Sequence, residues 1–310
     1  HVLTKENALD LLKGNNDIDI VWVWGKDKEK IKEINFDWVI NTEDDYETCS
    51  FVIELEKIKL TGPFLDKKKE ITYTQDSALF YDMGKISKFG LQKANELKKN
   101  NKRTYQNIYC EILGLNKNNY PIFLNLDEKQ KELTNAFRRE NKSSTKEILV
   151  GINTGAGVNW PLKSISIEKT IELIKELQKR GLKIVLLGGH NEKERNSEIL
   201  KKLDSKIIET NTENTLKEYI SLINALDLII TSDTLALHIS AALNKRIVSF
   251  FGPTSAEEVE IYGNGVKIKP DSDCYCCYQK NRIREIMCID EINLNDIVKA
   301  TLDQIKNFNK

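Results

Sequence analysis

The sequence predicts an α/β protein whose second half is a doubly wound domain with a parallel sheet. Short runs of consecutive apolar residues, typical of strands buried on both faces, alternate there with amphipathic helical segments. Several of these runs end in Gly, Ser or Thr, as strands do before a turn. Because 310 residues exceed what one core usually holds, we expect two domains, residues 1–144 and 145–310.

The composition argues against a nucleic-acid-binding protein and against a membrane-spanning one. Lys and Arg together number 47, as do Asp and Glu, and this zero balance argues against wholesale nucleic-acid binding. No apolar run approaches the roughly 18 to 20 residues needed to span a bilayer. With no secretory signal visible, the six cysteines are predicted to be reduced thiols in a cytoplasmic protein.

The first half begins with residues 1–13, which are predicted to form an amphipathic helix because their apolar residues lie near one face. A doubly wound domain normally opens with a strand, so we expect this domain to lack its first one. The other predicted elements are strands at 18–24, 38–40 and 59–62, helices at 44–58, 104–113 and 126–141, and a lysine-rich surface helix or loop at 87–99. The break at Ser143-Ser144-Thr145 predicts the linker.

The second half has the clearer pattern. Predicted strands cover residues 147–152, 183–187, 205–208, 228–231 and 246–251, and predicted helices cover 167–181, 192–203, 216–225 and 234–243. Ligands of such sheets bind beyond the carboxyl ends of the strands, so the residues that follow each strand are the candidate site.

The first two strand ends carry small and polar residues. Asn153, Thr154 and Gly155 follow the first strand, where small residues let a phosphate approach backbone amides and hydroxyls donate to it. An ordinary tight turn is the alternative. After the second strand, Glu192 either accepts hydrogen bonds from ribose hydroxyls or is only a favourable carboxylate in the first turn of a helix.

The other two strand ends complete the candidate site. Asp233 is predicted to cap a helix that Thr234 opens, and His238 lies four residues later on the same face, an arrangement suited to a pyrophosphate. Alternatively, Asp233 only caps and His238 only packs. Gly252 and Thr254 form a tight turn with a hydroxyl after the last strand, either a further wall of the site or a plain strand end.

Together, these segments resemble the C-terminal domain of glycosyltransferase family 9, the heptosyltransferases of lipopolysaccharide core synthesis and their relatives. The matching stretches are residues 151–163, 185–195, 230–242 and 248–254. A cysteine-bearing segment with Cys274, Cys276, Cys277 and Cys288 also fits the family. In the first half, the resemblance is limited to residues 20–24 and 36–45.

The resemblance implies the GT-B architecture, two Rossmann-like doubly wound domains facing across a cleft, with the N-terminal one truncated and on the acceptor side. It implies transfer of a heptose-like sugar from an ADP-linked donor to a glycan or lipid-linked acceptor, with no metal or cofactor. Peripheral contact with the inner face of the membrane is also implied. The implied donor-binding residues are Asn153, Thr154, Gly155, Lys163, Glu192, Asp233, Thr234, Leu235, His238, Gly252 and Thr254.

Three departures from the family pattern stand out. Val158 and Asn159 occupy the place of a basic residue, for which Lys163 is a possible replacement, and Leu235 occupies the place of a glycine. The family's Gly-Asp-Val loop, whose Asp is the expected general base, is expected upstream of His1. Asp44 and Asp45 are the candidate substitutes within the chain.

Other interpretations stay open. The four clustered cysteines are either a metal site or a structural segment of reduced thiols, and the latter is favoured because their spacing is not a standard zinc pattern. A nucleotide-sugar epimerase on the same fold would need acid and base carboxylates in the site. A non-catalytic nucleotide-sugar binder is the third possibility, and the departures listed above favour it.

Overall fold

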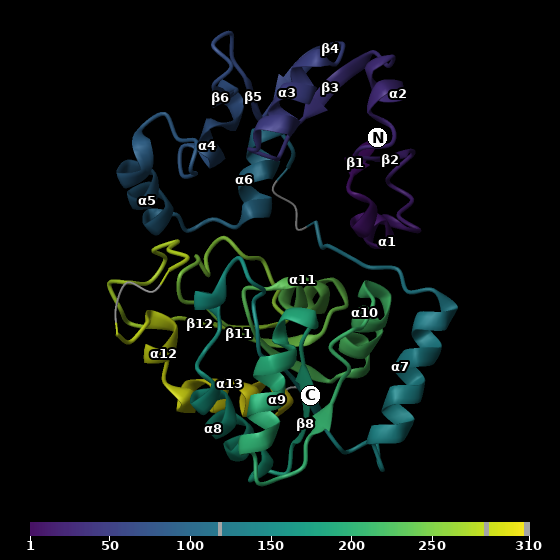
Figure 1. Ribbon diagram of the computed structural model, residues 1–310, viewed down its shortest axis with the longest axis vertical. Coiled ribbons are helices and arrows are strands. Elements are labelled where there is room, and N and C mark those ends of the chain that lie inside the picture. Colours follow the sequence, from purple (N-terminus) through teal and green to yellow (C-terminus); the bar gives the residue numbers. More distant parts are fainter. Residues whose placement is uncertain (117–119, 282–284, 307–310) are drawn as a thin grey trace. The chain divides into compact units, whose positions relative to one another are not determined.

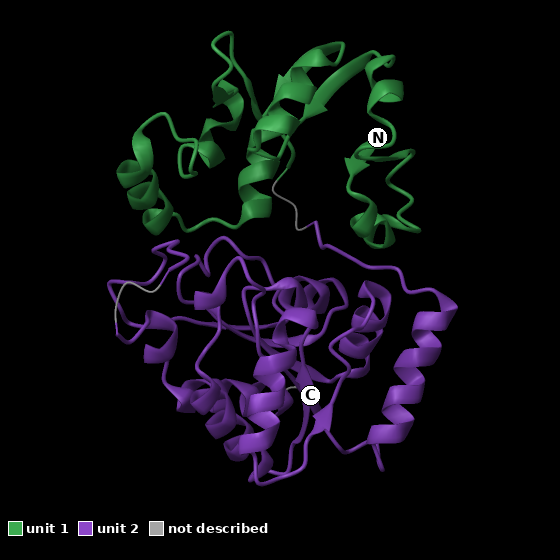
Figure 2. Ribbon diagram, viewed as in Figure 1, with its two compact units in different colours: residues 1–118 green, residues 119–310 purple. Residues whose placement is uncertain are grey.

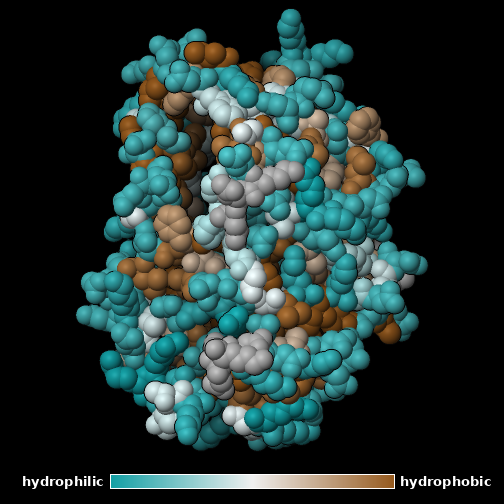
Figure 3. All heavy atoms as spheres, turned by 180° about the vertical axis from the view of Figure 1, so that it is seen from behind, coloured by the Kyte–Doolittle hydropathy of each residue, from teal (hydrophilic) through white to brown (hydrophobic). Residues whose placement is uncertain are grey.

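The computed structural model describes residues 1–116, 120–281 and 285–306 of the chain (Figure 1). It contains two compact units, His1–Asn118 and Asn119–Lys310, which we describe separately (Figure 2). No helix among the described residues is long and apolar enough to cross a membrane. On the face drawn in Figure 3, hydrophilic residues predominate and hydrophobic ones form separate patches.

The second unit is built on a six-stranded parallel sheet, which confirms the predicted α/β class. The strand order is β12-β11-β10-β7-β8-β9. The chain begins at the centre with β7 and runs to one edge at β9. It then returns to the centre at β10 and runs to the other edge at β12. This is the strand order of dinucleotide-binding sheets, and its switch point lies between β7 and β10. The strands are β7 (Leu149–Asn153), β8 (Lys183–Leu187), β9 (Ile208–Glu209), β10 (Leu228–Ser232), β11 (Arg246–Phe250) and β12 (Gly265–Ile268).

Helices cover both faces of this sheet. One core joins the sheet to α8 (Ile167–Gln178), α9 (Lys193–Lys202) and α13 (Leu294–Lys306), and another joins it to α11 (Leu235–Ala242). With α10 (Leu216–Ala225), four of these helices lie within a few residues of their predicted ranges. The strand β12 and the helices α12 (Cys288–Glu291) and α13 were not predicted, although Leu294, Ile297, Val298 and Thr301 have a helical period and are all buried.

The helix α7 (Glu128–Asn141) belongs to the second unit, so the structure divides the chain at residues 118 and 119 rather than at the predicted 144 and 145. It packs against α10 through side chains that bond to backbone carbonyls of that helix. Thr134 Oγ1 donates to the carbonyl of Ser221 at 3.0 Å, and Arg138 Nε donates to that of Ala225 at 2.8 Å. These contacts attach α7 to the second unit, although the polar residues that follow the helix had suggested a linker there.

In the first unit, the described strands pair as three separate two-stranded sheets. The parallel pair β3 (Phe36–Ile40) and β4 (Lys57–Thr61) flanks α3 (Tyr46–Glu54), and β5 (Pro63–Leu65) pairs with β6 (Ile71–Tyr73) in a hairpin. Between β4 and β5, Gly62 has φ +112°, and a Cβ there would lie 1.9 Å from the carbonyl oxygen of Asn41. The helices are α2 (Lys28–Lys32), α4 (Ala78–Tyr81), α5 (Gly90–Asn100) and α6 (Tyr105–Ile112).

The prediction of one helix over residues 1–13 is wrong. Residues Val2–Thr4 form β1, which pairs in parallel with β2 (Val21–Val23), and only Leu9–Leu12 form the α-helix α1. The apolar residues near the start satisfy a helical period, but Leu3 packs with Trp22 of β2 against a small core around Ile31 and Phe51, and a short isolated helix is marginal in water.

Candidate functional site

The carboxyl ends of β7 and β10 meet at the switch point of the second sheet, and Asn153 links them. Its amide nitrogen donates to the carbonyl of Gly155 at 2.8 Å and lies 3.3 Å from the hydroxyl oxygens of both Thr231 and Thr234. The structure therefore brings the first and third predicted segments to one point, although they are about 80 residues apart in the sequence.

The helix α11 begins at this point, one residue later than predicted. Thr234, not Asp233, is its N-cap residue, and no side chain caps it among the described residues. The Thr234 hydroxyl is instead 2.9 Å from that of Thr231. Free backbone N–H groups and the positive end of the helix dipole are thus available at the site, as anion binding requires. Leu235, the first helical residue, is 51% exposed.

Asp233 lies beside this helix start and is held by a cluster of polar side chains. Its carboxylate accepts a hydrogen bond from Lys163 Nζ at 2.7 Å and lies 3.7 Å from His238 Nε2. Burial by itself would raise the pKa of Asp233, but His238, Lys163 and Thr254 together hold it well below its usual range. The carboxylate is therefore a fixed negative charge that orients two cationic or polar groups, rather than a proton carrier near neutrality.

Thr254 belongs to residues 248–254, the stretch at the end of the last predicted strand that was expected to line the candidate site. Its side chain is buried, and its hydroxyl is close enough to Asp233 to lower the pKa of that carboxyl. Gly252 packs against α12, where a Cβ would lie 2.9 Å from the Cβ of Ile289. It shapes the turn and leaves no room for a side chain.

Glu192 lies after β8 at the start of a helix, as predicted, and its carboxylate bonds to the backbone of two loops. One carboxylate oxygen accepts from the N–H of Gly189 at 2.9 Å and the other from the N–H of Gly157 at 3.2 Å. The side chain therefore ties the loop after β7 to the loop after β8. Gly155 lies directly against it, because a Cβ there would come within 2.1 Å of Glu192 Cγ.

Three residues of the site had not been predicted from the sequence. Tyr219, on α10, donates its hydroxyl to the amide oxygen of Asn153 at 3.0 Å, and Asn196, on α9, accepts from the hydroxyl of Thr154 at 2.5 Å. Thr231 contacts both Asn153 and Thr234. Of these, only Thr231 carried a signal, as a hydroxyl at the end of a strand, because the other two lie within helices.

The cysteine segment packs against the fourth segment. The N–H of Cys276 donates to the carbonyl of Gly252 at 2.9 Å. Sγ of Cys274 lies 4.0 Å from that of Cys277, and all of the cysteines are free. Burial, with the neighbouring thiols of Cys274 and Cys277 adding to it, raises the pKa of Cys288 to about 12. Among the described residues, no group of three or more His, Cys, Asp or Glu side chains is placed to hold a metal ion.

Asp44 and Asp45, the candidate bases, lie at the start of α3 in the first unit. Asp45 caps the helix, accepting from the N–H and the hydroxyl of Thr48 at 3.0 and 2.7 Å. Burial would raise the pKa of Asp45, but the hydrogen bonds from Thr48 leave it below its usual range. Asp44 pairs with Lys85 at 2.7 Å. Both carboxylates thus have partners in the first unit, and their role as general bases stays a prediction.

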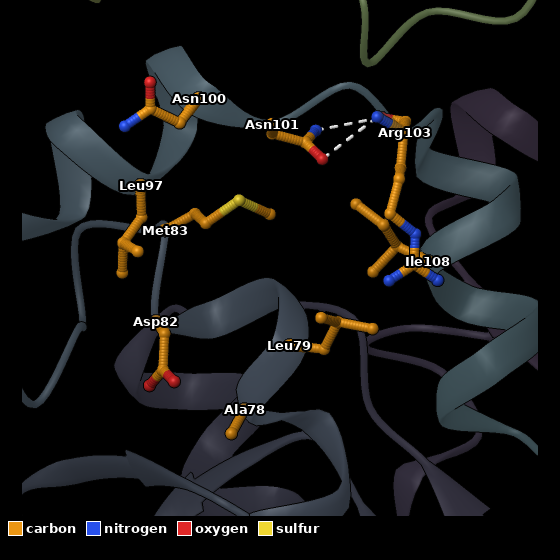
Figure 4. A pocket seen from close by; sticks show the side chains of 9 residues that line it. All are labelled: Ala78, Leu79, Asp82, Met83, Leu97, Asn100, Asn101, Arg103 and Ile108. Carbon is orange, nitrogen blue, oxygen red and sulfur yellow. Dashed lines mark hydrogen bonds between the residues drawn. The ribbon is translucent and has the colours of Figure 1, made fainter.

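A pocket of about 340 Å³ lies in the first unit between α4, α5 and α6 (Figure 4). Leu79, Met83, Leu97 and Ile108 line it with apolar side chains, and polar groups stand at its edge. The polar members are Asp82, Asn100, Asn101 and Arg103, and Ala78 completes the lining. A hollow of this size and composition is within the range of small-molecule sites.

Comparisons with known proteins identify the family of the chain. The family model for glycosyltransferase family 9 (heptosyltransferase) matches residues 24–285, which confirms the predicted resemblance. Lipopolysaccharide heptosyltransferase 2 of Escherichia coli (strain K12) is 29% identical over 139 residues, 43% of this chain and 38% of that protein. The Salmonella typhimurium protein of the same name is 31% identical over 111 residues, 34% and 30% of the two chains. The matched region spans less than half the length of either relative.

Solved structures share the fold over most of the chain. A glycosyl transferase of family 9 from Veillonella parvula superimposes with TM-score 0.73 at 19% identity, covering 98% of this chain and 87% of that one. The E. coli ADP-heptose LPS heptosyltransferase II gives 0.65 at 17% identity, covering 100% and 90%. An E. coli heptosyltransferase solved with ADP gives 0.51 at 14% identity, covering 89% and 75%. These likenesses confirm the predicted GT-B-like fold class.

Proposed function

The chain belongs to glycosyltransferase family 9, and from this membership we propose that it transfers a heptose-like sugar from an ADP-linked donor to a glycan or lipid-linked acceptor. The observation that carries the proposal is the polar cluster at the switch point of the second sheet. There Asn153 joins the ends of β7 and β10 beside the uncapped N-terminus of α11. Doubly wound sheets bind nucleotides at this position, and a helix N-terminus favours a diphosphate.

In this proposal, the reaction breaks the bond between the anomeric carbon and the diphosphate oxygen while the acceptor hydroxyl forms the new bond. Negative charge then develops on the departing diphosphate. The free N–H groups of α11, together with Thr234 and His238, are placed to stabilise that charge, which is where such groups have most effect on a rate. His238 is half exposed, so its imidazole can reach a ligand while staying near Asp233.

The alternatives fit this site less well. An epimerase needs carboxylates free to exchange protons, but Asp233 is paired with Lys163 and Glu192 accepts two backbone N–H groups. A non-catalytic binder would bind ADP and the sugar nucleotide without releasing ADP from it. Measuring ADP release from ADP-heptose, alongside binding, separates a binder from a transferase.

Replacing His238 with Ala is expected to weaken ADP binding about tenfold, because one hydrogen bond to a charged ligand is lost. Thr234→Val should have a similar effect. Isothermal calorimetry with ADP measures both. His190→Ala is the matched control, since His190 pairs with Glu213 on the exposed surface and should leave the affinity unchanged. Equal affinities of wild type and His238→Ala would contradict the assignment of the site.

We also propose that the acceptor approaches the first unit and that this unit touches a membrane surface. Support comes from residues 84–103, which hold seven Lys or Arg and one acidic residue in a chain with no net charge. Phe89 and Leu91, at the start of α5, are 61% and 62% exposed. Cationic residues beside exposed apolar ones are typical of surfaces that lie on anionic bilayers. Four residues that line the pocket belong to the same segment.

A vesicle sedimentation experiment tests this contact. The protein should bind vesicles with one third phosphatidylglycerol more tightly than pure phosphatidylcholine vesicles, and Phe89→Ser with Leu91→Ser should reduce that binding at least about fivefold. Val158→Ser is the control, because Val158 is 74% exposed but lies on the second unit. Equal binding to both kinds of vesicle, or no effect of the double substitution, would refute the proposed surface.

A further inference from the structure

The described residues of the donor site carry little net positive charge. Lys163, the one basic residue expected there from the sequence, donates to both the carboxylate and the carbonyl of Asp233, at 2.7 and 3.2 Å. The two side chains are only 13% and 15% exposed, so their charges largely cancel. The positive charge of Lys163 is therefore largely offset by Asp233, which leaves little of it for an anion.

A nucleoside diphosphate carries two to three negative charges at neutral pH. The N-terminus of α11 offers the equivalent of about half a positive charge. A ligand of this charge needs at least one further cation, either from the protein or as a bound metal ion.

The structure places such a cation on the loop that follows the cysteines. Lys280 Nζ lies 5.3 Å from the centre of the Trp160 indole ring, and Lys163 Nζ lies 5.0 Å from the same centre. Lys280 is exposed, and among the described residues no carboxylate pairs with it. Its ammonium group thus shares the Trp160 ring with Lys163, which in turn contacts Asp233.

The loop that carries Lys280 is fixed to the donor site. The N–H of Tyr278 donates to the carbonyl of Pro253 at 2.8 Å, and the Tyr278 hydroxyl bonds to the carboxylate of Glu258 at 2.8 Å. The Tyr278 ring also packs edge-on against Trp160, with ring centres 6.3 Å apart. The loop therefore holds Lys280 above the indole ring, next to the fourth segment of the site.

We infer that Lys280 is the cation that binds the donor diphosphate, in the place of the family's missing basic residue and of a metal ion. Trp160 supports the lysine stem and keeps its ammonium at the site. This inference rests on the proposed function, because it assumes that the switch point binds a nucleoside diphosphate.

Calorimetry with ADP and with adenosine, each in EDTA and in 1 mM Mg²⁺, tests the inference. Lys280→Met should weaken ADP binding about tenfold and change adenosine binding less than twofold, because only ADP carries the diphosphate. Lys280→Arg should retain most of the affinity. The matched control is Lys201→Met, an exposed lysine in the last turn of α9, which should leave both affinities unchanged.

Two results would overturn the inference. One is an unchanged ADP affinity of Lys280→Met, or an equal loss for ADP and adenosine, which would indicate only a structural role. The other is Mg²⁺-dependent ADP binding by the wild type that does not respond to Lys280, since the metal would then be the missing cation. A wild-type protein that binds no ADP under any condition would instead contradict the proposed function. Thermal unfolding checks that the variants are folded.

Discussion

Replacing Asp233 with Ala should lower the free energy of unfolding of the second unit by about 3 kcal/mol, and ADP binding should be lost with it. The substitution leaves the ammonium of Lys163, which is only 13% exposed, without its carboxylate partner. Removing one member of a buried ion pair is costly because the remaining charge is neither solvated nor compensated. Urea unfolding monitored by circular dichroism measures the change.

A surface ion pair of the same chemistry is the control. Lys175 and Asp204 lie 2.9 Å apart, but their side chains are 41% and 88% exposed. Asp204→Ala should therefore cost less than about 1 kcal/mol. The double variant Lys163→Met with Asp233→Ala should regain part of the lost stability, since no charge is then left unpaired. Equal costs for the buried and the exposed aspartate would show that the pair at the site does not act as described.

The contribution of Asp233 to the free energy of unfolding should fall in acidic solution. The pKa of this carboxyl is lower in the folded protein than its ordinary value of 3.8. The stability that it contributes is therefore fully present above that value and is lost as the pH falls below it. The difference in unfolding free energy between wild type and Asp233→Ala should therefore shrink as the pH falls below that value.

Gly155→Ala is expected to destabilise the second unit by about 2–4 kcal/mol and to weaken ADP binding at least tenfold. A Cβ at this position would come within 2.1 Å of Glu192 Cγ and 2.2 Å of its carboxylate, so the side chain of Glu192 would have to leave. Its hydrogen bonds to the N–H groups of Gly157 and Gly189 would then be lost. Each such bond to a charged acceptor contributes about 1.5–3 kcal/mol.

Gly189→Ala is a close control, because it is on the facing loop and touches the same side chain. A Cβ there would meet Glu192 Oε2 at 3.5 Å, an ordinary contact, and the backbone of Gly189 is extended. We expect it to change the unfolding free energy by less than about 1 kcal/mol. If both variants behave alike in unfolding and in ADP titration, Glu192 does not hold the two loops together.

The fold class of the second unit and the centre of its sheet could be predicted from the sequence alone. Strands buried on both faces are almost entirely apolar, and such runs at residues 183–187 and 228–231 are recognisable without any partner. The carboxyl ends of parallel strands must meet at one edge, so the polar residues after them could be assigned to one site. Asn153 and Thr234 are in contact for that reason.

The contacts of each of those polar residues became visible only in the folded chain. Glu192 accepts from two glycine N–H groups, and Lys163 is paired with Asp233, and no motif indicated either partner. Lys280 and Tyr219 enter the site from a loop and a helix with no motif of their own. Local sequence patterns report periodicity and turn chemistry over a few residues. Charge pairing and hydrogen bonding depend on which distant side chains the folded chain brings within about 3 Å of each other.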